Sequence, residues 1–299
     1  MVTGRFWWLR GHAAELARLG DDIAVGSKDL PPYQHALALT QAGFIVIANG
    51  DPARAQQLFE QTLPLYEQDN ERSPLSVTLN AMVLAVLGRL AARRRDYAAA
   101  SRLLDQGQAL LRERRDDDLS GYDRLQQQLT LGYLDNVRGQ IRLSQGDNDA
   151  AAQLFTDGLA AARRTQDWIP LLGSLYDLAL SSQAQGDLAG AAEHLREGLA
   201  LAAEARDETS AAYYLEALAA IAGQQDNPQR AVRLFAAARS ILDASGSGWL
   251  HAFVPRVPPD DAALAALRSR IGDAAFDQAQ AWGRSAGSKR AVEYALQEP

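Results

Sequence analysis

The stretch GDNDAAAQLF, Gly146–Phe155, contains the pattern that decides the fold of this chain. An Asp or Asn is followed four residues later by Ala, and four residues after that by a bulky apolar residue. The same pattern recurs after Asp51, Asp96, Asp187 and Asn227, so that successive anchors lie 45, 51, 40 and 40 residues apart. A pattern repeated at such intervals predicts a solenoid of helix pairs, in which each unit packs mainly on its neighbours.

At three positions of the repeat, counted from each anchor, the size of the side chain is constant. The side chain is small eight residues before the anchor, it is Ala four residues after it, and it is large and apolar eight residues after it. Small residues allow two antiparallel helices to approach closely, and the large one fills the space between repeats. The small residues eight positions before the anchors are Gly43, Gly88, Gly139, Ala179 and Ala219. The Ala residues four positions after them are Ala55, Ala100, Ala151, Ala191 and Ala231. The large residues eight positions after them are Phe59, Leu104, Phe155, Leu195 and Phe235.

The anchors also predict where the second helix of each pair begins. Asp and Asn side chains accept a hydrogen bond from an exposed backbone N–H in the first helical turn. Pro52 and Pro228 directly follow their anchors, at the first helical position, where a missing N–H costs nothing.

Composition narrows the fold and function classes. Ala, Leu, Gln and Arg are abundant and β-branched residues are sparse, which favours helix over strand. The absence of Cys excludes disulfides and thiolate chemistry, and the net charge of −7 argues against direct binding to nucleic acid. We find no signal-peptide core and no apolar stretch near the ~18 residues that span a bilayer. We therefore expect a cytoplasmic protein that has no membrane contact.

The register resembles the tetratricopeptide repeat, whose small and bulky positions fall at the same offsets. The likeness covers residues 33–245 and implies an all-α, right-handed solenoid of five helix pairs. Tetratricopeptide units have about 34 residues, whereas these repeats have 40 to 51, so we expect longer helices. In the third unit we expect a loop over 114–121 and a helix over 126–145.

The two ends depart from the repeat. Gly11 and His12 resemble a degenerate turn, so we expect residues 1–32 to form a truncated first repeat and the chain to be part of a longer protein. Residues 246–299 begin with a Gly/Ser- and Pro-rich loop. Three short helices are expected to follow, over 260–271, 273–285 and 289–296, as a C-terminal cap.

Both ends resemble those of bacterial signal-transducing ATPases that regulate transcription, of the maltose-regulator or LuxR type. The likeness lies in Arg5-Phe6-Trp7-Trp8-Leu9-Arg10-Gly11-His12 and in a tail that contains Ala281-Trp282-Gly283-Arg284 and Ala291-Val292-Glu293-Tyr294-Ala295-Leu296. It implies a sensor module that binds a protein, a peptide or a small inducer. A phosphate-binding loop and a DNA-reading helix-turn-helix are both missing from the sequence. The ATPase and DNA-binding domains are therefore expected elsewhere, in cis or in trans. A free-standing protein–protein adaptor is the alternative.

Catalytic and metal-binding patterns are weak, so we expect no enzyme, no cofactor and no metal. The four His residues, at 12, 35, 194 and 251, are scattered without metal-ligand spacing. Gly246-Ser247-Gly248 lacks the preceding strand that a nucleophile elbow needs. Asp116-Asp117-Asp118 follows three Arg residues and is best interpreted as a solvated mixed-charge loop.

Binding residues are predicted instead from the register. In a helix-pair solenoid, positions 14, 11, 7 and 3 residues before each anchor point into the concave face. We expect this groove to bind the ligand, because it is richer in aromatic and polar side chains than the packing positions beside it. The alternative is that these are ordinary half-exposed helix residues, some of them buried by the longer helices. The predicted set is Phe44, Arg89, Arg93, Tyr133, Asn136, Gln140, Tyr176, Tyr213 and Glu216.

Two charged groups remain open to two interpretations. Asp135 and Arg138 replace Leu at packing positions, three residues apart on one helix, and could form an ion pair or contact a ligand. Arg93-Arg94-Arg95 lies at a predicted helix C-terminus, where it could complement the helix dipole or bind an acidic partner.

Overall fold

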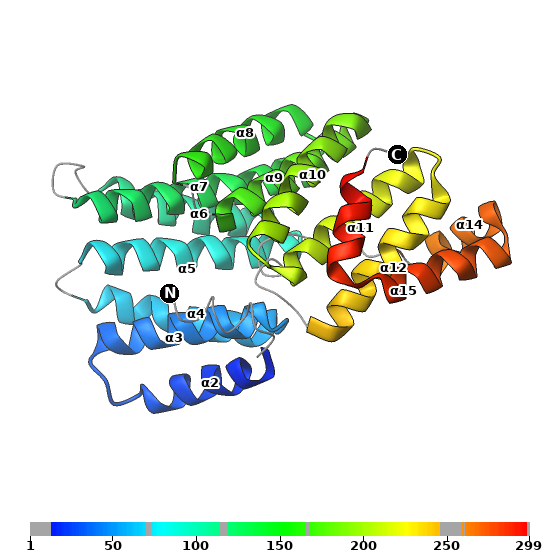
Figure 1. Ribbon diagram of the computed structural model, residues 1–299. Coiled ribbons are helices and arrows are strands. Elements are labelled where there is room, and N and C mark those ends of the chain that lie inside the picture. The colour runs from blue at the N-terminus through cyan, green and yellow to red at the C-terminus, as the bar shows by residue number, and fades with distance from the viewer. Residues whose placement is uncertain are drawn as a thin grey trace. The chain divides into compact units, whose positions relative to one another are not determined.

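The structure of this 299-residue chain is a computed structural model that describes residues 13–69, 73–113, 119–165, 168–245, 259 and 261–297. Within these residues every regular element is a helix, which confirms the predicted all-α fold of helix pairs (Figure 1). The chain forms two compact units, divided between Pro170 and Leu171. This division falls at the start of the fourth predicted helix pair, where the repeat pattern indicates no boundary.

The first unit contains a single helix followed by three helix pairs. Helix α3 packs on α4, α5 on α6 and α7 on α8, while α5 also contacts α4 and α7 (Figure 1). The preceding helix, α2, packs on α3. Gly11 and His12, the predicted degenerate turn, lie outside the described residues. The bounds are α2 Ala13–Gly26, α3 Pro32–Ala48, α4 Pro52–Glu67, α5 Pro74–Arg93, α6 Tyr97–Arg112, α7 Gly121–Ser144 and α8 Asn148–Thr165.

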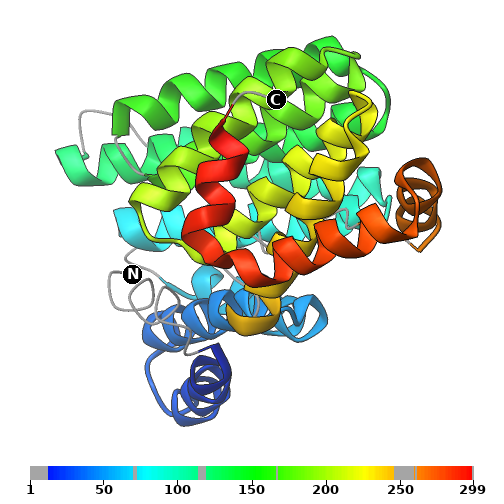
Figure 2. The ribbon, with the colours of Figure 1, turned by 45° about the vertical axis from the view of Figure 1, so that its right-hand side comes forward.

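The second unit contains the last two helix pairs and the C-terminal helices. Helix α11 packs on α10 and α12, and the terminal helix α15 lies along α12, as Figure 2 shows. A residue with positive φ, Gly287, kinks α15 into two segments at the place where the sequence predicts a break. The bounds are α9 Trp168–Ala184, α10 Leu188–Glu204, α11 Glu208–Gln224, α12 Pro228–Ser245, α14 Asp261–Ile271 and α15 Asp273–Leu296.

The predicted small and bulky positions meet inside the helix pairs. A Cβ atom added to Gly43 would lie 2.6 Å from the ring of Phe59, and one added to Gly139 would lie 2.5 Å from that of Phe155. All five Ala residues four positions after the anchors are fully buried. The repeat register is therefore confirmed as a packing register.

Predicted helix caps are present where the structure describes them. The carboxylates of Asp51, Asp96 and Asp187 accept hydrogen bonds from backbone N–H groups three residues later, at 2.9 to 3.0 Å. Asn227 does the same for the N–H of Arg230 at 3.3 Å. Asp207 caps α11 in the same way, although it begins the first helix of its pair rather than the second.

Longer helices account for the longer repeats, as expected. Helix α5 has 20 residues and α7 has 24. Our expectation that a loop extends to residue 121 and that the helix begins near 126 is wrong. Helix α7 begins at Gly121, because the Ser120 hydroxyl caps it by accepting from the N–H of Asp123 at 3.2 Å.

Helix α5 also corrects an expectation about apolar stretches. By length and composition alone, Pro74–Arg93 could cross a membrane. Of the most apolar 18 residues of this helix, 78% are buried within the protein, as is typical of a core helix. Its flanking helices α4, α6 and α7 supply that burial.

Candidate functional site

A groove in the first unit lies between the C-terminal ends of α4 and α6, with the N-terminal half of α5 as its floor. Its volume is about 360 Å³. Because α4 and α6 are the second helices of successive pairs, the groove lies between neighbouring repeats. The residues that line it are Leu63, Tyr66, Glu67, Ser76, Val77, Asn80, Leu84, Gln106, Ala109, Leu110 and Glu113.

The groove has apolar walls and a polar, acidic rim. Leu63, Val77 and Leu110 are half-buried and present apolar surface. Glu67 and Glu113 are exposed carboxylates, one on α4 and one on α6. Such a mixture fits a ligand that has an apolar part and a positive charge.

A buried hydrogen-bond acceptor adds a polar feature to the groove. The Oδ1 atom of Asn80 is shielded from solvent and accepts no hydrogen bond from any described residue. Buried acceptors of this kind are costly unless a donor reaches them. A ligand that carries an N–H group would supply that donor.

The groove is built from the added length of the helices. Ser76, Val77 and Asn80 lie 16 to 20 residues before their anchor, Asp96, and so extend beyond the first helix of a unit of about 34 residues. Glu113 lies 17 residues after the same anchor, near the end of the second helix. The two helices of this pair therefore continue past the point where the helices of a shorter repeat would end.

Tyr66 anchors one wall of the groove through a buried hydrogen bond. Its hydroxyl lies 2.9 Å from the hydroxyl of Thr40, which is fully buried on α3. Burial is the main cause that raises the pKa of Tyr66 to about 12, and the hydrogen bond from Thr40 opposes that rise.

The raised pKa of Tyr66 predicts a loss of stability in alkali. The unfolded chain releases the Tyr proton near pH 10. The folded chain retains it to about pH 12, so the stabilisation is complete below pH 10 and is lost between pH 10 and about 12. We expect urea unfolding across this range to show a shallower fall for Tyr66→Phe than for the unmodified chain. Parallel curves would contradict the assignment.

A second cavity, of about 530 Å³, lies beside α6 along Asp105, Gln108, Ala109, Arg112 and Glu113. Arg138 reaches across to this helix. Its guanidinium donates to Asp105 at 3.0 Å and to Gln108 at 3.2 Å, as well as to Asp135 on its own helix at 2.9 Å. The ion pair between Asp135 and Arg138 is therefore present, and Arg138 also ties α7 to α6.

The residues predicted to form the groove occupy several different environments, and none of them lines either cavity. In the first unit Arg89 is buried, and Arg93 is exposed at the end of α5. Phe44 packs edge-on against Phe59, and Tyr133 packs against the core between α5, α6 and α7. The remaining two, Asn136 and Gln140, are half-buried and hydrogen-bonded to each other at 3.3 Å.

Three more of the predicted residues are buried in the second unit. Tyr176 is 4% exposed and lies edge-on against Tyr214, at 5.7 Å between ring centroids. Tyr213 and Glu216 are 2% and 5% exposed. Their burial fits the alternative that longer helices cover these positions, and their role in ligand binding stays a prediction.

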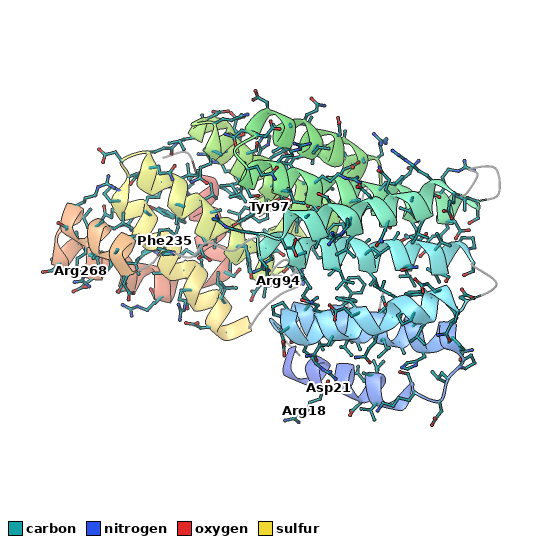
Figure 3. The ribbon with its side chains drawn as sticks, turned by 180° about the vertical axis from the view of Figure 1, so that it is seen from behind. Arg18, Asp21, Arg94, Tyr97, Phe235 and Arg268 are labelled. Carbon is teal, nitrogen blue, oxygen red and sulfur yellow. The ribbon has the colours of Figure 1, made fainter. Side chains whose placement is uncertain are left out.

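Other predicted features are placed as follows. Arg93, Arg94 and Arg95 are exposed at the turn between α5 and α6, where Figure 3 labels Arg94 and Tyr97. Arg94 donates to Gln56 on α4 at 2.7 Å. His35 and His194 are half-buried, and no described group of His, Asp and Glu could hold a metal ion. The remaining two His residues, Asp116–Asp118 and Gly246–Gly248 lie outside the described residues.

The observed groove could have been found only from the spacing of the anchors. The long intervals of 45 and 51 residues flank Asp96, whose helix pair supplies α5 and α6. Extra helical length near one anchor was visible in the sequence. Which side chains it would leave half-exposed depends on how neighbouring helices cover them, and the register alone does not specify this.

Comparisons with known proteins support the fold. A scan of protein-family models finds no match to the sequence, and a search of the curated proteins finds no relative. Among solved structures, BtubC (BKLC) from P. vanneervenii is similar with a TM-score of 0.53 and 16% identity, over 83% of this chain and 93% of that one. The apo form of RapI has a TM-score of 0.41 and 11% identity, over 96% of this chain and 94% of that one. At such low identity a likeness concerns the fold alone, and the first similarity agrees with a fold of packed helices.

Proposed function

We propose that this protein is a non-enzymatic binding module that holds a segment of a partner protein in the groove between α4, α5 and α6. The observation that carries this proposal is an apolar groove with an acidic rim in a fold of helix repeats. Stacked helix pairs commonly present such surfaces to peptides and proteins.

The chemistry of the groove specifies the segment. Leu63, Val77 and Leu110 favour an apolar side chain, while Glu67 and Glu113 favour a neighbouring Lys or Arg. The Asn80 carbonyl can accept a hydrogen bond from a backbone N–H of the segment. The preferred occupant is therefore a peptide that combines an apolar anchor with a basic residue.

The biological setting that we propose rests on the resemblance of both chain ends. We infer that the module is the sensor part of a signal-transducing ATPase that regulates transcription, in which binding would control the ATPase. In this setting the nucleotide-binding and DNA-binding domains act in cis or in trans. A small inducer in the same groove, and a free-standing adaptor without an ATPase, are the alternatives.

Selection of peptides tests the groove. We expect a displayed library of random peptides to yield binders that contain an apolar residue next to Lys or Arg. Leu63→Asp or Leu110→Asp should remove their binding, because each places an unpaired carboxylate on the apolar wall. The matched control is Leu19→Asp on α2, since Leu19 is 47% exposed and lies outside the groove. Binders that tolerate Leu110→Asp as well as Leu19→Asp would overturn the groove assignment.

The regulatory setting has its own test. Antibody capture from the source cells, followed by intact-mass measurement, reports the size of the native polypeptide. A species much heavier than these 299 residues would support a regulator in cis. A species of this size whose partners include neither an ATPase nor a DNA-binding protein would favour the adaptor.

A further inference from the structure

Three Arg side chains gather around one pair of aromatic rings in the second unit. Trp282 and Tyr294, both on α15, have ring centroids 4.7 Å apart. The guanidinium of Arg233 lies 5.6 Å from the centroids of both rings, and that of Arg290 lies 5.4 Å from Trp282. Arg230 lies 4.9 Å from the centroid of Tyr294. Burial is the main cause that lowers the pKa of Arg230, and the charge of the neighbouring Arg196 on α10 lowers it further.

This cluster lacks negative charge to balance it. Among the described residues, none of the four guanidiniums forms an ion pair with a carboxylate. The Nε atoms of Arg196 and Arg233 are shielded from solvent and have no hydrogen-bond acceptor in the described part of the chain. Like charges held together in this way are unfavourable unless an anion joins them. In a chain of net charge −7, such a concentration of positive charge requires an explanation.

One member of the cluster has a structural role. Arg230 is 9% exposed and donates to the carbonyl oxygens of Ala295 at 2.8 Å and Gln297 at 2.9 Å, at the C-terminal end of α15. Its bonds attach α15 to α12. Arg233 makes one long bond, at 3.3 Å to the hydroxyl of Tyr294, which leaves most of its donors available.

The same unit contains an arginine–aromatic contact that is balanced. Arg268 lies 4.2 Å from the centroid of Phe276 and pairs with Asp273 at 2.9 Å and Asp277 at 3.1 Å. An Arg stacked on a ring thus has carboxylate partners at this site but not in the cluster. Stacking alone therefore does not account for the unbalanced charge.

We propose that Arg233 and Arg290, which lie over the ring of Trp282, bind the phosphate group of a small molecule together with the neighbouring Arg196. Guanidinium groups that stack on rings keep their N–H edges free for bidentate bonds to an oxyanion. Several positive charges favour doubly charged phosphate over a single carboxylate. Three guanidiniums around one ring pair match one phosphate group, rather than the extended backbone of a nucleic acid.

The test is an NMR titration of the whole chain with inorganic phosphate, in which the Arg Nε–H resonances are observed at constant ionic strength. We expect the resonances of Arg196 and Arg233 to shift and saturate with phosphate, and to stay unchanged with chloride. Arg290→Gln should weaken phosphate binding about tenfold, the size of one charge-assisted bond. This variant should fold normally, because Arg290 is exposed.

Arg268→Gln is the matched control, since it removes a stacked but neutralised Arg from the same unit. It should leave phosphate affinity unchanged. An equal loss of affinity in both variants, or shifts with chloride that match those with phosphate, would overturn the site. Acetate that binds as tightly as phosphate would overturn the choice of phosphate as the ligand. The groove in the first unit shares no residue with this cluster, so the peptide tests neither support nor exclude it.

Discussion

Gly198→Ala is expected to lower the free energy of unfolding by about 2 to 3 kcal/mol. Gly198 lies on α10, where an added Cβ atom would overlap the ring of Tyr214 on α11. That ring has no room to move, because Tyr214 is fully buried and its hydroxyl donates to the carbonyl of Leu172 at 2.5 Å. Steric overlap should outweigh the ~1 kcal/mol by which Ala favours a helix over Gly.

Gly173→Ala provides a control in which the free energy of unfolding is expected to rise rather than fall. Gly173 lies in α9, and an added Cβ atom there would meet nothing within 4 Å. Its replacement should therefore stabilise the protein, by up to about 1 kcal/mol. Urea unfolding followed by circular dichroism measures both effects. A destabilisation by Gly173→Ala that equals that of Gly198→Ala would mean that α10 and α11 do not pack as described.

Ala191→Leu should have an effect of similar size, through the constant small position of the repeat. Ala191 is fully buried in α10, four residues after its anchor Asp187. A Leu side chain cannot enter a closely packed helix pair without moving the helices apart, at a cost of about 1 to 3 kcal/mol. We expect a lower midpoint of thermal unfolding.

The matched control for this substitution lies two residues away. Ala189 is exposed on the same helix, so Ala189→Leu should change stability by no more than about 0.5 kcal/mol. The difference between the two variants measures the packing of this position. If Ala191→Leu unfolds at the same temperature as Ala189→Leu, the repeat register is wrong.

Much of the fold could be predicted because its determinants are local. The caps at Asp51, Asp96 and Asp187 depend on residues three positions apart, and the contact between Gly43 and Phe59 depends on a fixed offset within one repeat. Such features repeat with the sequence and need no knowledge of the rest of the chain. The positions of the helix pairs follow from them.

The features that the register does not specify depend on context beyond the repeat. The start of α7 was placed too late because Ser120, which caps it, belongs to no repeated position. The division after Pro170 has no counterpart in the register. Likewise the register does not specify that Arg89 and Glu216, two polar residues at positions expected to face a ligand, are buried; their role in binding stays a prediction. Burial depends on which helices cover a position, and offsets within one unit do not report this.

Site-specific cross-linking in the source cells tests the central claim, that the groove between α4, α5 and α6 holds a segment of a partner protein. A photoreactive residue would replace Leu110 in the groove, and in a parallel experiment Leu19 outside it. We predict one dominant adduct from position 110, whose attached peptide has an apolar residue beside Lys or Arg, and no such adduct from position 19. The same adducts from both positions, or none from position 110, would contradict the proposed function.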